Sequence, residues 1–335
     1  MHQLPVSLLL REEETVYRSA SDGQKYTLAL DSIHANYSAK YFGKDKGVTI
    51  YSFISDNYLV FYTTVFSSGD YEAWYVLDGL LHNASTMPQE QTHSTDTHGV
   101  TDLNFAVTYL LGMVFQARIK DFHVSTLYGM PDVPIQPQDG YAFKTRGLVN
   151  PGLIAGQWDT IQRFLVTIKL NHALPSMLLR RLTSYASHHP LYQALRELGR
   201  IVKTTFLFQY MHEEETRRRV NHQLTKIENM HQLAAELNLG KNGLVRYASK
   251  EDLLVMARSK QLLINAMTCW NMLHISQKLQ ELTSLDRSQL LSSLPDTAPL
   301  SWKHINFQGE YDFSEGTLRN LINLELNQLL MRVIK

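Results

Sequence analysis

The chain has 335 residues, of which 44% are hydrophobic and 10% aromatic, enough for a large core in two or three lobes. Lysine plus arginine and aspartate plus glutamate both total 32, so no global basic field exists, and a nucleic-acid surface would need local clusters of charge. No uncharged run reaches membrane-spanning length and the first residues lack a signal peptide, so we expect a soluble protein with no membrane partner.

Short runs of β-branched and aromatic residues, separated by turn residues, dominate the first third of the chain. We predict strands at 15–21, 25–30, 47–55 and 57–66. The apolar residues then change to helical spacing, and we predict helices at 70–83 and 102–115. Strands followed by crossing helices indicate an α/β core.

A stretch rich in proline and glycine, residues 128–147, is typical of a linker. The pattern after it is almost entirely helical, and we predict helices at 153–170, 175–185, 191–215, 216–237 and 250–282. Cys269 is the only cysteine, and it stands in the apolar segment INAMTCWNML. We therefore expect a buried thiol with no intrachain disulfide, as in a reducing cytosol.

The polar stretch HSTDTHGVTD, residues 93–102, lies just before a predicted helix. Thr101 and Asp102 could be ordinary caps of that helix. Asp96 is too far upstream to cap the same helix, and an acidic loop after a strand is a common place for a metal ligand. Taken alone, this signal is weak.

Several catalytic motifs are absent from the sequence: it has no G-x-S-x-G, no phosphate-binding G-K-S/T loop, no H-E-x-x-H and no paired C-x-x-C. His188 and His189 precede Pro190, and a histidine pair without further ligands is more often a polar loop than a zinc site. The charged segment HEEETRRR, residues 212–219, is by default a solvated helix face with ion pairs four residues apart.

Taken together, the motifs of this sequence resemble the catalytic C-terminal region of the Tn-three family of replicative transposases. The resemblance spans most of the chain in the family's order and rests on the segments SASDGQKY, DSIHANYSAKYFGKDKGVTIYSFISD, YVLDGLLHN, TDTHGVTD, RIKD, SMLLRRLTSY, ALRELGRIVKTTFLFQYM and LSWKHINFQGEYDF. It implies a DDE transposase, whose three acids would be Asp22 in the S-D-G-Q motif, Asp96 in the T-D-T motif and Glu228 in a long helix.

The resemblance also implies that these three acids bind divalent metal. Mg²⁺ prefers hard oxygen ligands and keeps several waters, so a few carboxylates and the substrate phosphates complete its coordination. Two such ions can activate the attacking oxygen and stabilise the leaving one in an in-line displacement. We therefore expect two Mg²⁺ ions, with Mn²⁺ able to substitute. Glu228 borders an apolar helix stripe containing Leu224 and Ile227 and could point toward a cleft.

The fold class implied is α/β: an RNase H-like mixed sheet core of the DDE transposase type, with a large helical insertion and a helical C-terminal part. Residues 1–127 would form the first part of the catalytic core, with Asp22 and Asp96. Residues 128–212 would form the helical insertion lobe, and residues 213–335 would complete the core with Glu228 and the C-terminal helices.

The function implied is nicking of transposon ends to release a 3′-hydroxyl, followed by transfer of that hydroxyl into target DNA. The partner would be DNA, in a bacterial cytoplasm and associated with the nucleoid. The residues placed to contact phosphate are Arg180, Arg181, Arg217, Arg218, Arg219 and Lys226. For each of these arginines taken singly, a surface ion pair with Glu213 to Glu215 is an equally good interpretation.

Two differences from the family leave a second function open. Ile227 and Ala235 stand where the family has glycine and arginine, and Leu239 replaces a phenylalanine. Family members also carry amino-terminal modules that recognise the inverted repeats and help dimerisation, so we interpret this chain as a separately encoded or truncated catalytic region. It would act alone, as a dimer or with a partner polypeptide that supplies those modules. The alternative is a catalytically silent remnant that only binds DNA or oligomerises.

Overall fold

The computed structural model describes residues 17–82, 91–120, 124–131, 145–185, 189–238, 244–281 and 298–310, together with residues 286, 312 and 314. The first elements are β1 (Tyr17–Thr27), β2 (Asn36–Tyr37), α2 (Ala39–Phe42), β3 (Lys46–Ser55) and β4 (Val60–Ser67). Strands are found where we predicted them, but the predicted strands at 15–21 and 25–30 form the single strand β1.

The next elements alternate between helix and strand. They are η1 (Glu72–Tyr75), α3 (Val76–Leu81), β5 (Gln91–Thr95), η2 (Thr97–Gly99), α4 (Asp102–Leu110) and β6 (Val114–Ala117). The helix predicted at 102–115 is therefore too long, because Gly112 adopts a φ of 80°, which is outside the helical region, and the chain continues as β6.

The six strands β1 to β6 form one mixed sheet, which confirms the predicted α/β class. The strand order is β2-β3-β1-β5-β6, and β4 also pairs with β3, on the edge opposite β1 and beyond β2. β1 pairs antiparallel with β3 and parallel with β5, and β5 pairs parallel with β6. β1 therefore lies in the middle of the sheet, next to the point where antiparallel pairing gives way to parallel pairing.

The rest of the described chain is mainly helical, as we predicted. Its elements are β7 (Tyr128–Gly129), β8 (Gly147–Leu148), α5 (Pro151–Gly156), α6 (Trp158–Lys169), α7 (Pro175–Ser184), α8 (Pro190–His212), α9 (Glu214–Glu236), α10 (Lys250–Glu281) and η5 (Ala298–Leu300). The helix predicted at 153–170 is divided at Gln157 into α5 and α6. Among the described helices, none is both long enough and apolar enough to cross a membrane.

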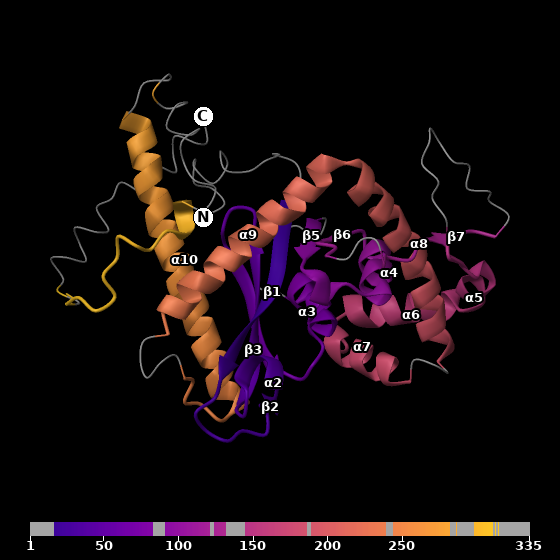
Figure 1. Ribbon diagram of the computed structural model, residues 1–335, viewed down its shortest axis with the longest axis horizontal. Coiled ribbons are helices and arrows are strands. Elements are labelled where there is room, and N and C mark those ends of the chain that lie inside the picture. The colour runs from indigo at the N-terminus through magenta and orange to yellow at the C-terminus, as the bar shows by residue number, and fades with distance from the viewer. Residues whose placement is uncertain are drawn as a thin grey trace.

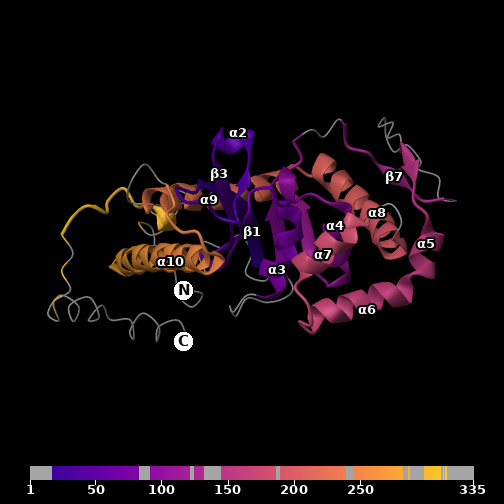
Figure 2. The ribbon, with the colours of Figure 1, turned by 90° about the horizontal axis from the view of Figure 1, so that it is seen from below.

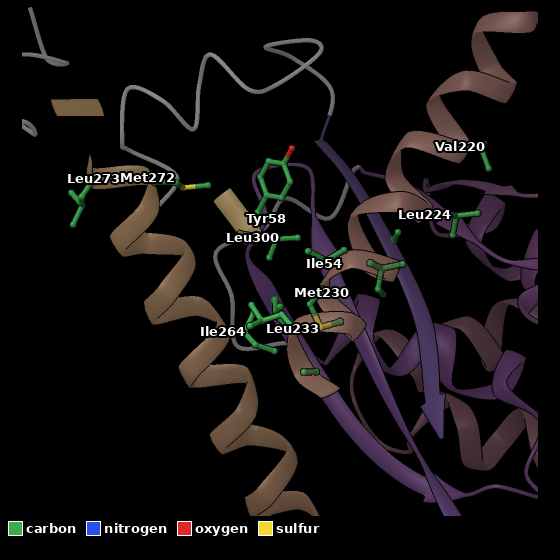
Figure 3. Packing of buried hydrophobic residues seen from close by; sticks show 14 residues of the cluster. Ile54, Tyr58, Val220, Leu224, Met230, Leu233, Ile264, Met272, Leu273 and Leu300 are labelled. Atoms are coloured by element: carbon green, nitrogen blue, oxygen red, sulfur yellow. The ribbon is translucent and has the colours of Figure 1, made fainter. Parts of the chain in front are cut away.

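Helices cover both faces of the sheet, because alternate residues of β3 are apolar on both faces. Tyr51 and Phe53 pack with α3, α4 and α8, whereas Ile54 packs with α9 and α10. Figure 2 shows β1 and β3 between α9 and α10 on one side and α3, α4 and α7 on the other. Figure 3 shows Ile54, with Met230 and Ile264, in the apolar cluster between α9 and α10.

Cys269 packs against this cluster as a free thiol. Its side chain is only partly buried, whereas we had expected a buried one.

The helical segment from α5 to α8 shares a core with the helices that follow the first strands. Ile161 of α6, Leu179 of α7 and Leu195 of α8 are buried in one cluster with Leu103 and Val107 of α4. α8 runs so close to α4 that a Cβ atom on Gly199 would lie 1.8 Å from the carbonyl oxygen of Asp102. The segment is thus anchored on the sheet-bearing part, and the domain boundaries at 127 and 212 stay a prediction.

Candidate active site

Asp22 and Asp96 lie at the same edge of the sheet because their strands are parallel neighbours. The last aligned pair of β1 and β5 is Ser21 with Thr95. Asp22 directly follows Ser21, and Asp96 directly follows Thr95. β1 continues beyond this point in its pairing with β3, while the chain after β5 turns into η2. The register therefore places the two aspartates at neighbouring strands; their assignment as metal ligands stays a prediction.

The Asp96 carboxylate caps η2. It accepts hydrogen bonds from the backbone N–H of His98, at 2.9 Å, and from the His98 ring Nδ1, at 2.7 Å. Thr101 caps α4 as we predicted, accepting from the backbone N–H of Asn104 at 3.0 Å. Asp102 is not the cap but the first residue of α4, and it pairs with Lys203 of α8 at 3.2 Å. A structural role for Asp96 thus exists alongside the proposed metal role.

The Asp22 carboxyl lies in a concentration of negative charge. Burial, followed by the negative charge of Asp96, raises the pKa of Asp22 to about 7, with smaller contributions from Glu72 and Glu228. The backbone N–H of Gly23, 2.8 Å from Asp22 Oδ1, opposes this shift. Asp96 and Glu228 therefore both act electrostatically on Asp22, although the three acids come from distant parts of the chain.

Glu72 is a further carboxylate at this site that sequence reasoning missed. Its side chain is 12% exposed and pairs with Lys25 of β1 at 2.7 Å. A Cβ atom on Gly23 would lie 2.9 Å from the Glu72 carboxylate, so a side chain at position 23 would collide with it. Glu72 belongs to a segment that we predicted only as a helix, and its proximity to Asp22 depends on how η1 folds against β1.

Glu228 is carried by α9, which packs across β1 and β5 and is seen crossing the sheet in Figure 1. The side chain of Gln24 donates to the backbone carbonyl of His231 at 2.9 Å and so ties α9 to β1. The Glu228 side chain is 48% exposed, and its Oε1 lies 3.1 Å from Nη1 of Arg118, which follows β6. It therefore lies at the same edge as Asp22, paired with a cation and half exposed to solvent.

His231, three residues after Glu228, faces Asp22 with its Nδ1 3.7 Å from Oδ2. Burial lowers the pKa of His231 to about 4, so the ring is neutral at pH 7 and this contact is not an ion pair. Sequence reasoning did not identify His231 or Arg118 as part of the site. Both are fixed by how α9 and the end of β6 meet β1.

The donor set at this edge fits a hard divalent cation in kind, since it consists of carboxylate oxygens and its negative charge is concentrated enough to raise the pKa of Asp22. In the part of the chain that the structure describes, however, no group of three or more His, Cys, Asp or Glu side chains is arranged to hold a metal ion. In addition, Arg118 engages the third carboxylate, that of Glu228, at 3.1 Å.

Four of the six basic residues that we assigned to DNA fall into two groups. Arg180 and Arg181 are exposed on α7, where Arg180 lies 3.6 Å from Asp70 and over the ring of Trp74. Arg218 and Arg219 pair with Glu214 and Glu215 one turn earlier, at 2.8 and 2.9 Å, which is the ion-pair interpretation left open by the sequence.

Two other assignments change more. Arg217 donates to the backbone carbonyls of Tyr210 and Met211, at 2.6 and 2.8 Å, and so satisfies the C-terminal end of α8. Lys226 is fully buried, with its Nζ donating to the backbone carbonyl of Asp56 at 3.0 Å and lying over the ring of Tyr58. The assignment of Lys226 to DNA phosphate is therefore wrong, because its ammonium group is enclosed beneath α9.

Known proteins resemble this chain over most of its length. Residues 1–311 match the family described as the Tn3 transposase DDE domain. The transposase for transposon Tn1546 of Enterococcus faecium is 35% identical over 308 residues, covering 91% of this chain and 30% of the relative. The transposase for transposon Tn501 of Pseudomonas aeruginosa is 34% identical over 297 residues, covering 88% and 29%.

A more distant relative, the transposase for transposon gamma-delta of Escherichia coli K12, is 29% identical over 323 residues, covering 92% of this chain and 31% of the relative. The chain therefore spans about 30% of the length of the curated relatives that it matches. Since the family match covers almost the whole chain, as its motifs predicted, this protein belongs to the Tn3 (Tn-three) transposase family.

Proposed function

We propose that this chain is the catalytic region of a DNA transposase that nicks transposon ends and transfers the released 3′-hydroxyl into target DNA. The observation that carries the proposal is the position of Asp22 and Asp96 directly after the last pair of the parallel pairing between β1 and β5, with the Glu228 helix crossing over them. Three carboxylates from distant segments then share one edge of the sheet, as a metal-dependent phosphoryl transfer requires.

The core of this region would be RNase H-like. Three antiparallel strands, β4, β3 and β1, followed by the parallel strands β5 and β6, support this assignment. The segment 128–212 would be the insertion between the strands that carry the aspartates and the helix that carries Glu228. Because α8 leads directly into α9, the insertion would also set the position of that helix.

Asp22 and Asp96 would hold the metal, and Glu228 would join them after leaving Arg118. Mg²⁺, as two ions, is the expected cofactor, with Mn²⁺ able to substitute; when bound, it activates the attacking oxygen and stabilises the leaving one. Arg118, released from Glu228, would be a positive group beside the DNA phosphate. Glu72 would stay with Lys25, because that pair is largely enclosed.

DNA would lie over this edge, with the exposed Arg180 and Arg181 as phosphate contacts. Recognition of the transposon ends would come from a dimer or from a partner polypeptide that supplies the parts found in the longer relatives. This role places the protein in the bacterial cytoplasm, associated with the nucleoid.

The test is nicking and strand transfer, with Mg²⁺ or Mn²⁺, on DNA that carries the cognate ends, with and without the amino-terminal part of a longer relative. Asp96→Ala removes both the charge and the cap, whereas Asp96→Asn retains an oxygen that can cap η2. We expect both variants to lose activity. Asp31→Asn is the matched control, because the Asp31 side chain is 95% exposed and pairs with the exposed Lys46.

The Arg118 contact of Glu228 favours a second candidate function, a catalytically silent chain that only binds DNA or oligomerises. No nicking under any of these conditions, by folded protein that binds the same DNA, would support this candidate. Nicking that persists in Asp96→Asn would instead exclude the proposed role of Asp96.

A further inference from the structure

A pocket of about 310 Å³ opens between η1, the start of α4, α7 and α8. We call it the aromatic pocket and define it by Tyr71, Trp74, Leu179, Thr183, Tyr192 and Arg196. Its volume is at the lower end of the range for small-ligand sites, which suits one planar heterocycle. The proposed catalytic residues do not line it.

The aromatic pocket is adjacent to the loop that carries Asp96. Thr101 and Asp102, five and six residues after Asp96, form part of its wall. The Tyr71 hydroxyl lies 3.5 Å from the backbone carbonyl of Val100, which follows the short helix capped by Asp96. Burial raises the pKa of Tyr71, and the negative charges of Asp96 and Asp102 add to the shift, which is consistent with this closeness.

The chemistry of the aromatic pocket is that of a stacking site. Tyr71 and Trp74 meet edge to face with ring centroids 6.0 Å apart, and the Tyr71 side chain is 42% exposed. Guanidinium groups lie over two of the rings: Arg180 over Trp74 and Arg196 over Tyr192, each 5.8 Å from the ring centroid. The buried Nε of Arg196 has no hydrogen-bond partner among the described residues.

Aromatic faces combined with guanidinium groups are the means by which proteins bind bases that have left the DNA stack. The local charge permits an anionic strand to approach, because Asp102 is paired with Lys203 and Asp70 lies beside Arg180. A stacking site of this kind also offsets the cost of taking a base out of the duplex.

We infer that the aromatic pocket takes one unstacked nucleobase of the DNA strand whose phosphodiester lies at Asp22 and Asp96. This inference rests on the proposed function, because the neighbouring acids are what bring the strand to the pocket. A protein side chain is the competing occupant. The ring pair, the two guanidiniums and the position beside Asp96 favour the base.

The experiment uses a single-stranded dodecathymidylate carrying one central 5-iodouracil, which offers a base without needing the cognate ends. Photo-crosslinking to the unmodified chain, followed by peptide mapping, is expected to place the crosslink on Tyr71, Trp74 or Tyr192. Crosslinks confined to other surfaces of the chain would overturn the inference.

A binding measurement with the same oligonucleotide supplies the matched control. Tyr71→Ala is expected to weaken binding by about 5- to 100-fold, the range for loss of one base-stacking contact, whereas Tyr71→Phe retains the ring and the affinity. Tyr247→Ala removes a tyrosine of similar exposure, 46%, near α10 and should leave binding within about twofold of the parent, as for surface substitutions without partners. Equal binding by Tyr71→Ala and Tyr247→Ala would contradict the inference.

These results separate the inference from the proposed function. Crosslinking is performed without metal and in Asp96→Asn, so it does not depend on nicking. Nicking that requires Asp96, together with a crosslink elsewhere, would contradict only the inference that the aromatic pocket binds a base. A crosslink in the pocket, together with nicking that does not depend on Asp96, would support the base site and contradict the proposed catalytic role of Asp96.

Discussion

Asp22 and Asp96 are carried by the sheet, whereas Glu228 is carried by a helix that crosses it. The two aspartates follow an aligned pair of parallel strands, and their side chains are only 24% and 20% exposed. Glu228 of α9 is 48% exposed and pairs with Arg118. The same chemical group is therefore held in two different ways within one proposed site.

The difference shows how the two supports respond to repulsion between like charges. Hydrogen bonds between strands fix the backbone positions of the two aspartates, so their repulsion cannot separate them, and it contributes instead to the raised pKa of Asp22. A glutamate on a half-exposed helix face has free rotamers and settles against the nearest cation. The sheet thus sets the position of the charge, and the helix supplies a carboxylate that can move.

The largest effects are expected from Asp22→Asn, which removes one of the two carboxylates that the sheet holds in place. We expect nicking to fall by about 1000-fold or more, equivalent to about 4 kcal/mol of transition-state stabilisation. The same change removes a carboxylate from a site of negative charge and should raise the free energy of unfolding of the metal-free protein by about 1–3 kcal/mol at pH 8. Activity assays and urea denaturation measure the two effects.

The opposite signs make this prediction specific to Asp22. Asp31→Asn, at an exposed position, should change neither nicking nor the free energy of unfolding by more than about 0.5 kcal/mol. An Asp22→Asn protein that is both inactive and less stable than the parent would show that the carboxylate supports the fold, contrary to the proposed role.

The next largest effect is expected at Lys226, which is buried on the inner face of α9. Its ammonium group donates to the Asp56 carbonyl beneath α9, so Lys226→Ala leaves a cavity and a buried acceptor without that donor. We expect a loss of about 2–4 kcal/mol in the free energy of unfolding. Lys226→Met keeps the apolar stem and should lose about half as much.

DNA binding distinguishes this buried lysine from the exposed arginines. Lys226→Met, measured while folded, should leave the salt dependence of duplex binding unchanged. Arg181→Ala should reduce the slope of log affinity against log salt by about 1, as expected for one lost phosphate contact. An equal reduction by both variants would restore Lys226 as a DNA contact.

Sequence patterns predicted the strands β3 and β4 and most of the long helices, because their apolar residues repeat with a clear period. They missed β5, whose described side chains at Thr92, His93, Ser94 and Thr95 are all buried although all are polar. A buried polar strand has no hydrophobic signal; in β5 the His93 ring is held by hydrogen bonds to Ser19 and Ser21 of β1. The sequence resemblance identified Asp96, but only the register explains why it lies beside Asp22.

The partners of the acids could not have been predicted from sequence for a related reason. Arg118 and Glu72 lie far from Glu228 and Asp22 in the chain, and their contacts depend on how β6, η1 and α9 meet β1. Ile227, which stands where the family has glycine, is fully buried in the cluster between α9 and the sheet. A larger residue is accommodated there because α9 turns that side toward apolar neighbours.

A smaller effect tests how firmly β1 and β5 are joined. His93 of β5 is buried between two serines of β1, with Ser19 Oγ and Ser21 Oγ each 2.8 Å from a ring nitrogen. Burial lowers the pKa of His93 from 6.5 to about 3. Between these values the unfolded chain binds a proton that the folded chain excludes, so this residue makes stability fall as the pH drops from 6.5 toward 3.

His93→Gln isolates this contribution. Asp22, with its raised pKa, changes stability with pH in the opposite direction, so the quantity to measure is the difference between variant and parent. Urea denaturation from pH 8 to pH 4 should show the variant less stable at pH 8, with the gap narrowing by up to about 1 kcal/mol per pH unit below 6.5. A difference in stability that stays constant with pH would mean that His93 takes up a proton in the folded protein as readily as in the unfolded chain.

The smallest expected effect tests whether Glu228, the carboxylate carried by α9, is held away from the metal by Arg118. Arg118→Ala should change the free energy of unfolding by less than about 1 kcal/mol, because both partners of the ion pair are partly exposed. It should nevertheless raise the affinity for Mn²⁺ by about two- to fivefold, since Glu228 no longer has to leave a cation before binding one. Calorimetric titration of the metal-free protein measures this affinity.

A double-mutant cycle then shows whether Arg118 acts through Glu228. Glu228→Gln should weaken Mn²⁺ binding, and adding Arg118→Ala to it should change nothing further, because the carboxylate that Arg118 engages is already gone. Arg218→Ala breaks a similar exposed ion pair, with Glu214 at 2.8 Å near the start of α9, and should leave the affinity for Mn²⁺ unchanged. An equal gain from Arg118→Ala in the parent and in Glu228→Gln would mean that the arginine repels the metal directly and does not act through Glu228.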